Sequence, residues 1–440
     1  MSRTIRGATD LLRFGALFAT SSSFRAAVHR ARLDVGERAR ETTQMTLETS
    51  RASVGARVHR RLSGAALAFA GVQAVPAPRR VNLVLNEFDP VRLFAGVSTA
   101  LDVAVAIATE SGAELRLLTL SERLTRETGV AAAEALVARG APMEVVTRTE
   151  IADAEFGEDD VWIVTHWTTA HPVQVAVDDG RIRADRVVYL VQDFEPGFAG
   201  WSTPSAVARD TYEAGFHLLV NSRPLWRYLV DRVGLDIPES RVFAPALATA
   251  RLDRVADRSA DEGRVRVFFY GRPGKPRNLF DLGLAALEHA ALRLGDRAAR
   301  VEFLSAGEPH PDVLLTETAT VRSVGTLGWE EYFDLLARTD VALSLQASPH
   351  PSHPPLEAAI AGAISVTNEF EQTRGDLHPR LRAVEAHPRM LGDAVVAAIE
   401  HTWNAGRGTF APPVGDALGR PLADVVRDLL TELPGLSRRT

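Results

Sequence analysis

Short apolar runs alternate with stretches of helical periodicity along most of this chain, and the alternation occurs twice. The first series begins at Val81 to Leu85, and the second begins at Val265 to Tyr270, after a charged stretch that follows Leu247. Runs that are apolar throughout are typical of strands buried on both faces, which pair in parallel when helices connect them. The pattern therefore predicts an α/β fold of two tandem doubly wound, Rossmann-like domains that face each other across a cleft.

Breaks in this alternation divide the chain into four parts. Pro76 and Pro78 end the first part, because prolines so close together stop a helix and begin an extended segment. The predicted parts are a basic N-terminal extension, helical or partly disordered (1–79), an N-terminal domain (80–247), a C-terminal domain (264–411) and a helical C-terminal segment (412–440). The last part is a candidate to cross back to the N-terminal domain.

Charge and cysteine content exclude several classes of protein. The net charge is −6, but residues 1–61 hold twelve arginines against five acids, so they carry about +7 and the rest of the chain about −13. An acidic body argues against a nucleic-acid enzyme, whose binding domain is normally basic. The chain has no cysteine, which excludes disulfides, thiolate metal sites and a cysteine nucleophile, and which suits a cytoplasmic location.

The basic extension leaves two interpretations open. Leu62 to Val75 is the most apolar stretch of this region, but fourteen residues are too few to span a bilayer. Residues 1–75 could instead bind peripherally to anionic lipid at the inner face of the cell membrane, through their arginines. The alternative is an extension that packs on its own domain.

Lys275 is the only lysine of the chain, against 49 arginines, and it lies in a glycine-containing turn after the strand that starts at Val265. Arg272 and Arg277 lie in the same turn, and a helix is predicted to follow. Glycines let a ligand approach the backbone, and a helix N-terminus flanked by cationic side chains attracts anions. The turn is therefore predicted to bind phosphate, unless its cations simply face water.

Four other loops at predicted strand ends collect polar residues. They hold Gly96, before a helix that we expect Ser98 to cap; His166, in a loop from Thr165 to Thr169; Asp193 with Glu195; and Glu357, predicted in the first turn of a short helix. A carboxylate among apolar groups has a raised pKa and suits proton transfer, so Asp193 and Glu195 are candidate catalytic groups beside His166. Solvated acids and a structural histidine are the alternative. Glu357 is placed to accept hydrogen bonds from a ribose diol.

Several of these loops together resemble those of a known enzyme family. Gly96-Val97, Gly271-Arg272 through Lys275, and Leu356-Glu357-Ala358 with Gly362 occur in an order that resembles the family-4 retaining glycosyltransferases of the GT-B fold. More narrowly, Val191 to Phe198 and Ser348 to Glu357 look like the WsaF-type rhamnosyltransferases, which build bacterial surface polysaccharide. The resemblance covers roughly residues 80–415 and leaves the basic extension aside.

The resemblance implies a role for the residues of the donor side. Arg272 and Lys275 would neutralise the diphosphate of a nucleotide-sugar donor, with Arg277 as a helper. Gly96 would lie near the distal phosphate. Glu357 would bind the donor ribose.

The resemblance also implies where the rest of the substrates lie. The nucleobase would be bordered by Gly325, Thr326 and Leu327, and the loops at His166 and Asp193 would face the transferred sugar and the acceptor. The family commonly places a second glutamate eight residues before the ribose-binding one, but here that position is Pro349. The departure fits a 6-deoxy sugar better than an ordinary hexose.

The resemblance implies a glycosyltransferase that moves rhamnose from dTDP-rhamnose, with retention, onto a growing cell-surface glycan or a lipid-linked saccharide. No metal and no cofactor beyond the donor are expected, because no paired aspartates of the divalent-metal kind stand out and the cations could stabilise the leaving diphosphate. Two alternatives stay open. One is a non-catalytic protein that binds a nucleotide sugar or a glycan in a polysaccharide assembly complex. The other, a dinucleotide-dependent oxidoreductase, is disfavoured because no Gly-x-Gly-x-x-Gly follows the first strand of either domain.

Overall fold

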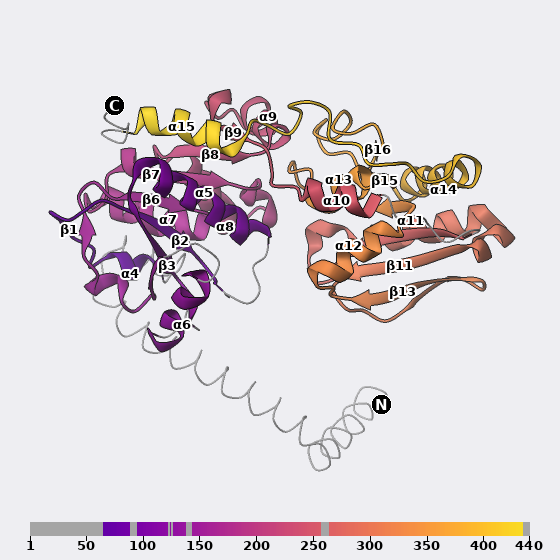
Figure 1. Ribbon diagram of the computed structural model, residues 1–440, viewed down its shortest axis with the longest axis horizontal. Coiled ribbons are helices and arrows are strands. Elements are labelled where there is room, and N and C mark those ends of the chain that lie inside the picture. The colour runs from indigo at the N-terminus through magenta and orange to yellow at the C-terminus, as the bar shows by residue number, and fades with distance from the viewer. Residues whose placement is uncertain are drawn as a thin grey trace, which may run out of the picture. The chain divides into compact units, whose positions relative to one another are not determined.

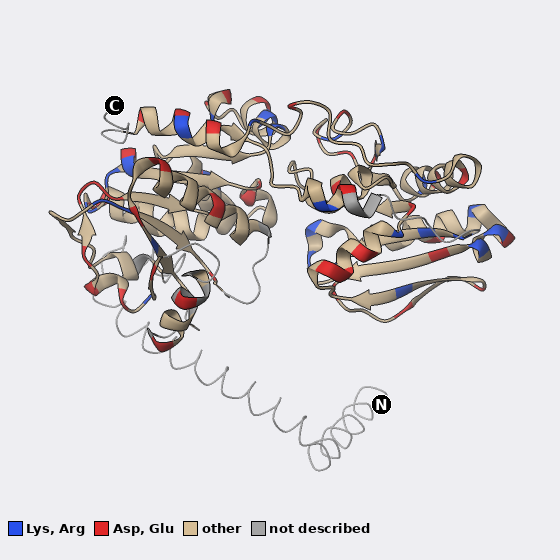
Figure 2. Ribbon diagram, in the orientation of Figure 1, with Lys and Arg blue, Asp and Glu red and all other residues tan. Residues whose placement is uncertain are grey.

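The computed structural model describes residues 65–88, 95–121, 124, 126–137, 143–256 and 264–433 (Figure 1). The chain divides into two units, Met1–Gly64 and Ala65–Thr440, and everything below concerns the second unit. The predicted basic extension lies outside the described residues as far as Gly64, and so does the membrane contact predicted for that stretch. Charged residues of both signs lie on the helices and loops of both domains (Figure 2).

The N-terminal domain is built on a seven-stranded sheet in which every pair of neighbouring strands is parallel. Its strand order is β4 (Glu144–Val146), β3 (Glu114–Thr119), β2 (Arg80–Leu85), β6 (Val161–Val164), β7 (Val187–Val191), β8 (His217–Asn221) and β9 (Val242–Phe243). Strands β6 and β7 are buried over their whole length, as the continuous apolar runs predict. The chain starts in the middle of the sheet, moves to one edge and then builds toward the other, which is doubly wound topology.

Helices cover both faces of this sheet. The helices of the domain are α4 (Ala66–Phe69), α5 (Ala95–Ser111), α6 (Arg126–Val137), α7 (Trp167–Asp178), α8 (Thr203–Asp210) and α9 (Arg223–Asp231). One apolar core includes side chains of α5, and the other includes side chains of α7 and α9. The helix α15 (Leu422–Glu432) near the C-terminus buries Val425 and Leu429 in the first core, so the chain returns from the second domain to pack against α5.

The C-terminal domain has a second seven-stranded sheet. Its order is β12 (Val313–Thr316), β13 (Ala319–Gly325), β11 (Val301–Gly307), β10 (Val265–Gly271), β14 (Val341–Leu343), β15 (Ile364–Asn368) and β16 (Leu381–Val384), all parallel except β12, which forms an antiparallel hairpin with β13. The helices are α10 (Thr249–Ala256), α11 (Phe280–Leu294), α12 (Trp329–Ala337), α13 (His353–Ile360) and α14 (Pro388–Ala405). Helices α11 and α14 share one core and α10, α12 and α13 the other, so the predicted pair of doubly wound domains is confirmed.

The stretch from Ala65 to Val75 packs on the N-terminal domain. Phe69 and Val72 are each 1% exposed, and the Phe69 ring meets the edge of Trp162 at a centroid distance of 6.0 Å. The two-residue strand β1 (Ala74–Val75) pairs in parallel with β5 (Phe156–Gly157). Phe69 and Val72 therefore belong to the core of the N-terminal domain, so this described part of the predicted extension packs on its own domain.

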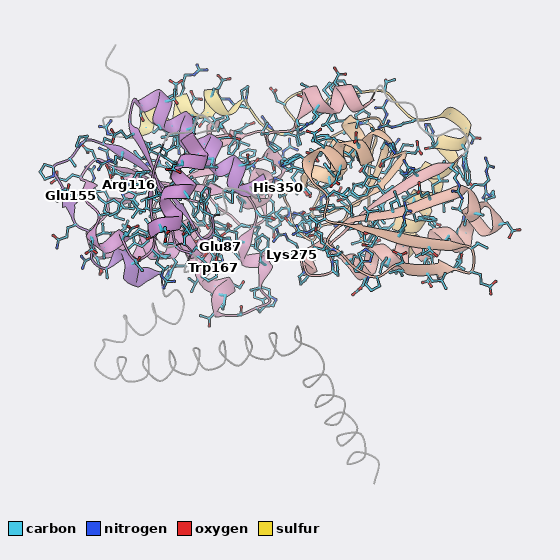
Figure 3. The ribbon with its side chains drawn as sticks, turned by 60° about the horizontal axis from the view of Figure 1, so that its bottom comes forward. Glu87, Arg116, Glu155, Trp167, Lys275 and His350 are labelled. Atoms are coloured by element: carbon cyan, nitrogen blue, oxygen red, sulfur yellow. The ribbon has the colours of Figure 1, made fainter. Side chains whose placement is uncertain are left out.

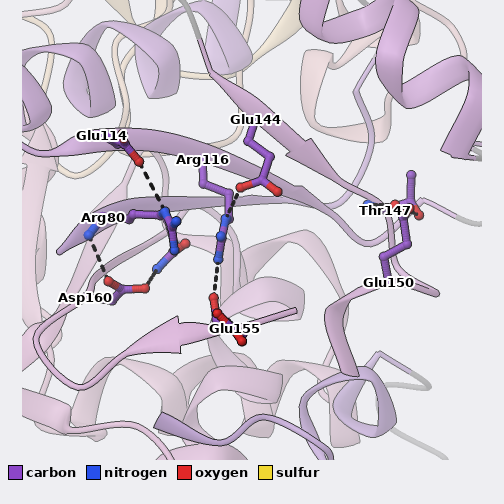
Figure 4. A network of polar contacts seen from close by, with 9 residues as sticks. Arg80, Glu114, Arg116, Glu144, Thr147, Glu150, Glu155 and Asp160 are labelled. Carbon is purple, nitrogen blue, oxygen red and sulfur yellow. Dashed lines mark hydrogen bonds and ion pairs between the residues drawn. The ribbon is translucent and has the colours of Figure 1, made fainter. Parts of the chain in front are cut away.

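A polar network ties together the amino ends of the strands (Figure 4). The Asp160 carboxylate accepts hydrogen bonds from the Arg80 backbone N–H at 2.8 Å and from the Asn82 side chain at 2.9 Å. The buried Arg116 donates to Glu144 at 2.7 Å and to the Glu155 carbonyl at 2.8 Å. Because ligands bind at the opposite, carboxyl ends of the strands, this network stabilises the sheet away from the expected site.

Three local predictions are wrong. Ser98 does not cap a helix, because α5 begins at Ala95 and Ser98 lies inside it. Glu357 is not in the first turn of its helix, because α13 begins at His353 and Glu357 lies one turn later. The loop predicted over residues 165–169 is the start of α7: the Thr169 hydroxyl accepts from the His166 N–H at 3.1 Å, so His166 takes the capping position and the helix begins at Trp167.

Candidate functional site

The polar residues singled out in the sequence lie at the carboxyl ends of the two sheets. His166 follows β6, and Asp193 and Glu195 follow β7. Arg272, Lys275 and Arg277 follow β10 and precede α11, in a loop that contains the 3-10 turn Pro276–Asn278 (Figure 3). The carboxyl end of a doubly wound sheet is where such folds bind ligands.

Arg277 connects the loops of the two domains. Its guanidinium lies over the Phe198 ring, with a distance of 4.5 Å to the ring centroid. Burial, and then the charge of Arg277, lower the pKa of His166 to about 4. Burial raises the pKa of Asp193, and the Arg277 charge opposes that rise. One cation of the basic turn therefore acts on both of these candidate catalytic groups, which are far from it in sequence.

Asp193 hydrogen-bonds to the second domain. It is buried, and its Oδ1 accepts from the Phe194 N–H at 2.9 Å and from the Ser348 hydroxyl. Ser348 lies in the proline-rich loop before α13, so this contact joins two of the loops predicted to belong to one site. Burial is the largest influence on the carboxyl and raises its pKa, against the hydrogen bond from Ser348.

Glu195 is held by the interior of the N-terminal domain. Its Oε2 accepts from the Tyr189 hydroxyl at 2.9 Å and from the Trp167 N–H at 2.5 Å, and its own N–H donates to the Tyr212 hydroxyl at 3.2 Å. Burial raises the pKa of Glu195 to about 8, in spite of these donors. The contacts are those of a group that fixes the loop against the start of α7, and a role for Glu195 in proton transfer stays a prediction.

The basic turn places its three cations differently. Arg272 lies 3.4 Å from Glu308, which also accepts a hydrogen bond from the Gly274 N–H at 2.7 Å. Arg277 points to Phe198, as described above. Lys275 is exposed and makes no ion pair within the described part of the chain. Of the three, only Lys275 is therefore left entirely to solvent.

Glu357, the residue assigned to a ribose, is buried in α13. Its Oε2 accepts from the Tyr332 hydroxyl at 2.6 Å, and its Oε1 lies 3.9 Å from His353 Nδ1. Burial, and then the negative charge of Glu357, raise the pKa of Tyr332 well above its ordinary value. The Tyr332 bond holds the carboxylate in one orientation.

The two glycine positions lie beside other residues of the site. Gly96 is in the first turn of α5, where its carbonyl accepts from the Gln192 side chain at 3.1 Å, next to Asp193. Gly325 ends β13 with a positive φ of 73°, and the Thr326 hydroxyl donates to the Gly307 carbonyl at 3.1 Å. Leu327 follows in the same loop and packs partly buried with the core of α12 and α13. Thr326, in the predicted nucleobase border, therefore contacts Gly307, the residue before Glu308.

Two residues of this region were not assigned a role from the sequence. Arg374 is 1% exposed and donates to the carbonyls of Asn368 at 2.5 Å, Gln346 at 2.8 Å and Ser348 at 2.6 Å; burial lowers its pKa to about 10. It thereby fixes the loop that carries Ser348. Nothing in the sequence separates this arginine from the other 48, because its carbonyl partners are remote in the chain.

The second such residue is His350, in the same proline-rich loop (Figure 3). Its Nδ1 accepts from the Ser352 N–H at 3.1 Å, and Ser352 has a positive φ of 67°, a strained backbone for serine. The buried His350 Nε2 has no partner within the described residues. Burial is the main cause that lowers the pKa of His350 to about 3, so the ring is neutral at ordinary pH. The prolines around His350 predict a rigid loop, but they do not predict that the imidazole ring is buried.

No helix among the described residues is both long enough and apolar enough to cross a membrane. They also contain no cluster of three or more His, Asp or Glu side chains arranged to hold a metal ion.

Two doubly wound domains in tandem, with a C-terminal helix packed back on the first, define the GT-B class of fold. Residues 80–220 match the N-terminal domain of the WsaF family and residues 265–397 match its C-terminal domain, which together make up more than half of the chain. The chain belongs to the WsaF family of GT-B glycosyltransferases, so the family predicted from the sequence is confirmed.

Individual proteins give further likenesses. The O-antigen biosynthesis protein RfbC of Myxococcus xanthus is 33% identical over 284 residues, which are 64% of this chain and only 21% of that protein, so the match spans about a fifth of its length. The N-terminal domain of a trehalose-6-phosphate phosphatase from Candida albicans superposes with a TM-score of 0.52 at 12% identity, over 81% of this chain and 97% of that one, and shows the shared fold. Anabaena HepE, in complex with UDP, has a TM-score of 0.48 at 12% identity, over 82% of this chain and 98% of that one.

Proposed function

We propose that this protein transfers a sugar from a nucleotide-sugar donor onto a glycan during the synthesis of a bacterial surface polysaccharide. Membership of the WsaF family supports the reaction class, and the partial match to a protein named for O-antigen biosynthesis supports the pathway class. Our more specific proposal is that rhamnose is the sugar and dTDP-rhamnose the donor. It is supported by the resemblance of the loop from Ser348 to Glu357 to rhamnosyltransferases, and by Pro349 in place of a sugar-binding glutamate.

The observation that carries this proposal is the position of the basic turn. Arg272, Lys275 and Arg277 lie between the end of β10 and the start of α11. The first N–H groups of a helix have no acceptor within the helix, and this favours an anion at its start. The bond to the sugar breaks with a growth of negative charge on the leaving diphosphate. Cations aimed at that charge stabilise the transition state more than the ground state, and so accelerate the reaction. We propose that these cations act without a divalent ion and that the sugar is transferred with retention.

The acceptor side is assigned to the loops after β6 and β7. Because its pKa is lowered to about 4, His166 is neutral near pH 7 and can form a hydrogen bond with a hydroxyl without adding a positive charge. Asp193 has a raised pKa and lies beside Ser348, so it is the stronger candidate to receive the acceptor's proton. Glu195 stabilises this loop through its hydrogen bonds with Trp167 and Tyr189.

Titration calorimetry with dTDP, UDP, GDP and NAD, with EDTA and then with Mg²⁺, tests the proposal. Selective binding of dTDP in EDTA is the expected result. Preference for UDP or GDP would keep the reaction class and refute the donor, and a requirement for Mg²⁺ would refute metal independence. Binding of NAD alone would overturn the function.

A non-catalytic role in glycan assembly is the second candidate, and one observation favours it. Both candidate carboxylates are engaged inside the protein, Asp193 by Ser348 and Glu195 by Tyr189. Donor hydrolysis decides between the two candidates, since an enzyme releases the nucleoside diphosphate slowly even without acceptor. Tight nucleotide binding with no release over hours, and no transfer to lipid-linked saccharides, would favour the binding protein.

A further inference from the structure

The predicted phosphate site already holds an anion that belongs to the protein. Glu308 Oε2 accepts a hydrogen bond from the Gly274 N–H at 2.7 Å, and its Oε1 lies 3.4 Å from Arg272 Nη2. Backbone N–H groups and guanidinium groups are donors that commonly bind phosphate oxygens in proteins. The carboxylate therefore takes up hydrogen-bonding groups that a diphosphate would use.

The backbone that carries Glu308 is fixed against the strand that carries the basic turn. The Glu308 N–H donates to the Gly271 carbonyl at 2.9 Å. Gly307 has a φ of +140°, and a Cβ there would lie 2.6 Å from the same carbonyl, so this approach requires glycine. The position of the backbone is therefore set by the ends of β10 and β11, while the Glu308 side chain is 26% exposed and borders solvent.

The charges of the basic turn explain what this carboxylate does there. Arg272, Lys275 and Arg277 lie within six residues of one another, and their like charges repel. Glu308 offsets part of that repulsion and keeps Arg272 ordered near Gly274. A bound diphosphate would supply more negative charge to the same groups, and then Glu308 would repel it at close range.

We propose that Glu308 is an internal competitor for the donor phosphate: it occupies the Gly274 and Arg272 donors until the diphosphate binds, and then swings away. This inference rests on the proposed function, because it concerns the same site. On this account Glu308 limits the affinity for the product diphosphate and thereby speeds its release. A residue that only held the turn in shape would instead increase affinity.

Glu308→Gln separates these two roles. The amide keeps the size of the side chain and removes its charge. We expect inorganic pyrophosphate, and whichever of dTDP, UDP and GDP binds the wild type, to bind Glu308→Gln roughly two- to fivefold more tightly, the range for a partly exposed charge contact. Glu317→Gln, which removes an exposed carboxylate in the turn between β12 and β13, is the matched control and should leave affinity unchanged.

The gain should also depend on Arg272. In an Arg272→Ala background, Glu308 has lost one of its two anchors and competes less, so Glu308→Gln should bring a smaller gain than in the wild type. Unchanged or weaker binding by Glu308→Gln, in protein with an unchanged melting temperature, would overturn the inference and leave the proposed function intact. A wild type that binds neither nucleoside diphosphates nor pyrophosphate, beside a Glu308→Gln variant that binds pyrophosphate only, would support the competitor and refute the nucleotide-sugar donor. If neither protein binds any of these anions, both ideas are refuted.

Discussion

Glu195 provides a test of whether burial or hydrogen bonding controls a charge in this fold. Burial raises its pKa to about 8, against 4.5 for an ordinary glutamate, although two donors and the start of α7 favour the charged form. The folded protein then binds a proton that the unfolded chain has lost above pH 4.5. The stability from that proton is complete below pH 4.5 and disappears as the pH rises through 8.

The size of this effect follows from the two pKa values. Each pH unit between 4.5 and 8 removes about 1.4 kcal/mol from the free energy of unfolding, which sums to about 5 kcal/mol. Glu195→Gln imitates the protonated side chain. Both donors, the Trp167 N–H and the Tyr189 hydroxyl, converge on a single oxygen, Oε2, so one amide carbonyl can accept both hydrogen bonds. The variant should therefore lose the pH dependence without losing the contacts.

Urea unfolding of wild type and Glu195→Gln from pH 5 to pH 9 measures the difference directly. We expect Glu195→Gln to become progressively more stable than the wild type as the pH rises, and the difference to level off above pH 8. The buried histidines titrate in both proteins, so their contribution cancels in the comparison. Glu158→Gln, at an exposed position, should show a constant difference. A constant difference for Glu195→Gln as well would mean that the helix start and the two donors outweigh burial, and that Glu195 is charged at neutral pH.

Three further results are expected. Lys275→Ala should weaken binding of the donor nucleoside diphosphate by roughly 1.5–3 kcal/mol in calorimetry, the scale for hydrogen bonds to charged groups; unchanged affinity would remove Lys275 from the phosphate site. Asp160→Ala leaves the Arg80 N–H and the Asn82 amide without their acceptor and should lower the free energy of unfolding by roughly 2–4 kcal/mol in urea titrations, whereas a loss below about 0.5 kcal/mol would show that water replaces the carboxylate. Removal of residues 1–64, which spares Phe69 and Val72, should reduce binding to anionic vesicles and leave donor hydrolysis unchanged; equal vesicle binding would refute the predicted membrane contact.

The sequence predicted the strands better than the contacts between loops. Val81 to Leu85 is predicted as a buried strand and lies in β2, because a continuous apolar run is typical of a central strand of a parallel sheet. The start of α7 was missed because His166 and the threonines after it have polar side chains typical of loops, and the capping bonds that fix a helix there cannot be seen as periodicity.

The same limit applies to the candidate site. The ends of parallel strands located His166, Asp193 and the basic turn, since the topology alone brings strand ends to one edge of a sheet. The hydrogen bond from Ser348 to Asp193 joins residues 155 positions apart, and no local pattern encodes it. The role of Arg374 could not be predicted either, because its partners are backbone carbonyls, which every residue has.

The contacts of the basic turn rank its cations for donor binding. Lys275 is exposed and has no ion pair within the described ranges. A diphosphate that binds Lys275 therefore displaces only water from the ammonium group and breaks no ion pair. Arg272 already holds Glu308, and a diphosphate gains only the difference between two anions. Lys275→Ala should therefore weaken binding more than Arg272→Ala, although arginine offers more hydrogen-bond donors. A larger loss of affinity in Arg272→Ala than in Lys275→Ala would refute this ranking. It would show that the guanidinium binds Glu308 and the diphosphate at the same time, through different N–H groups.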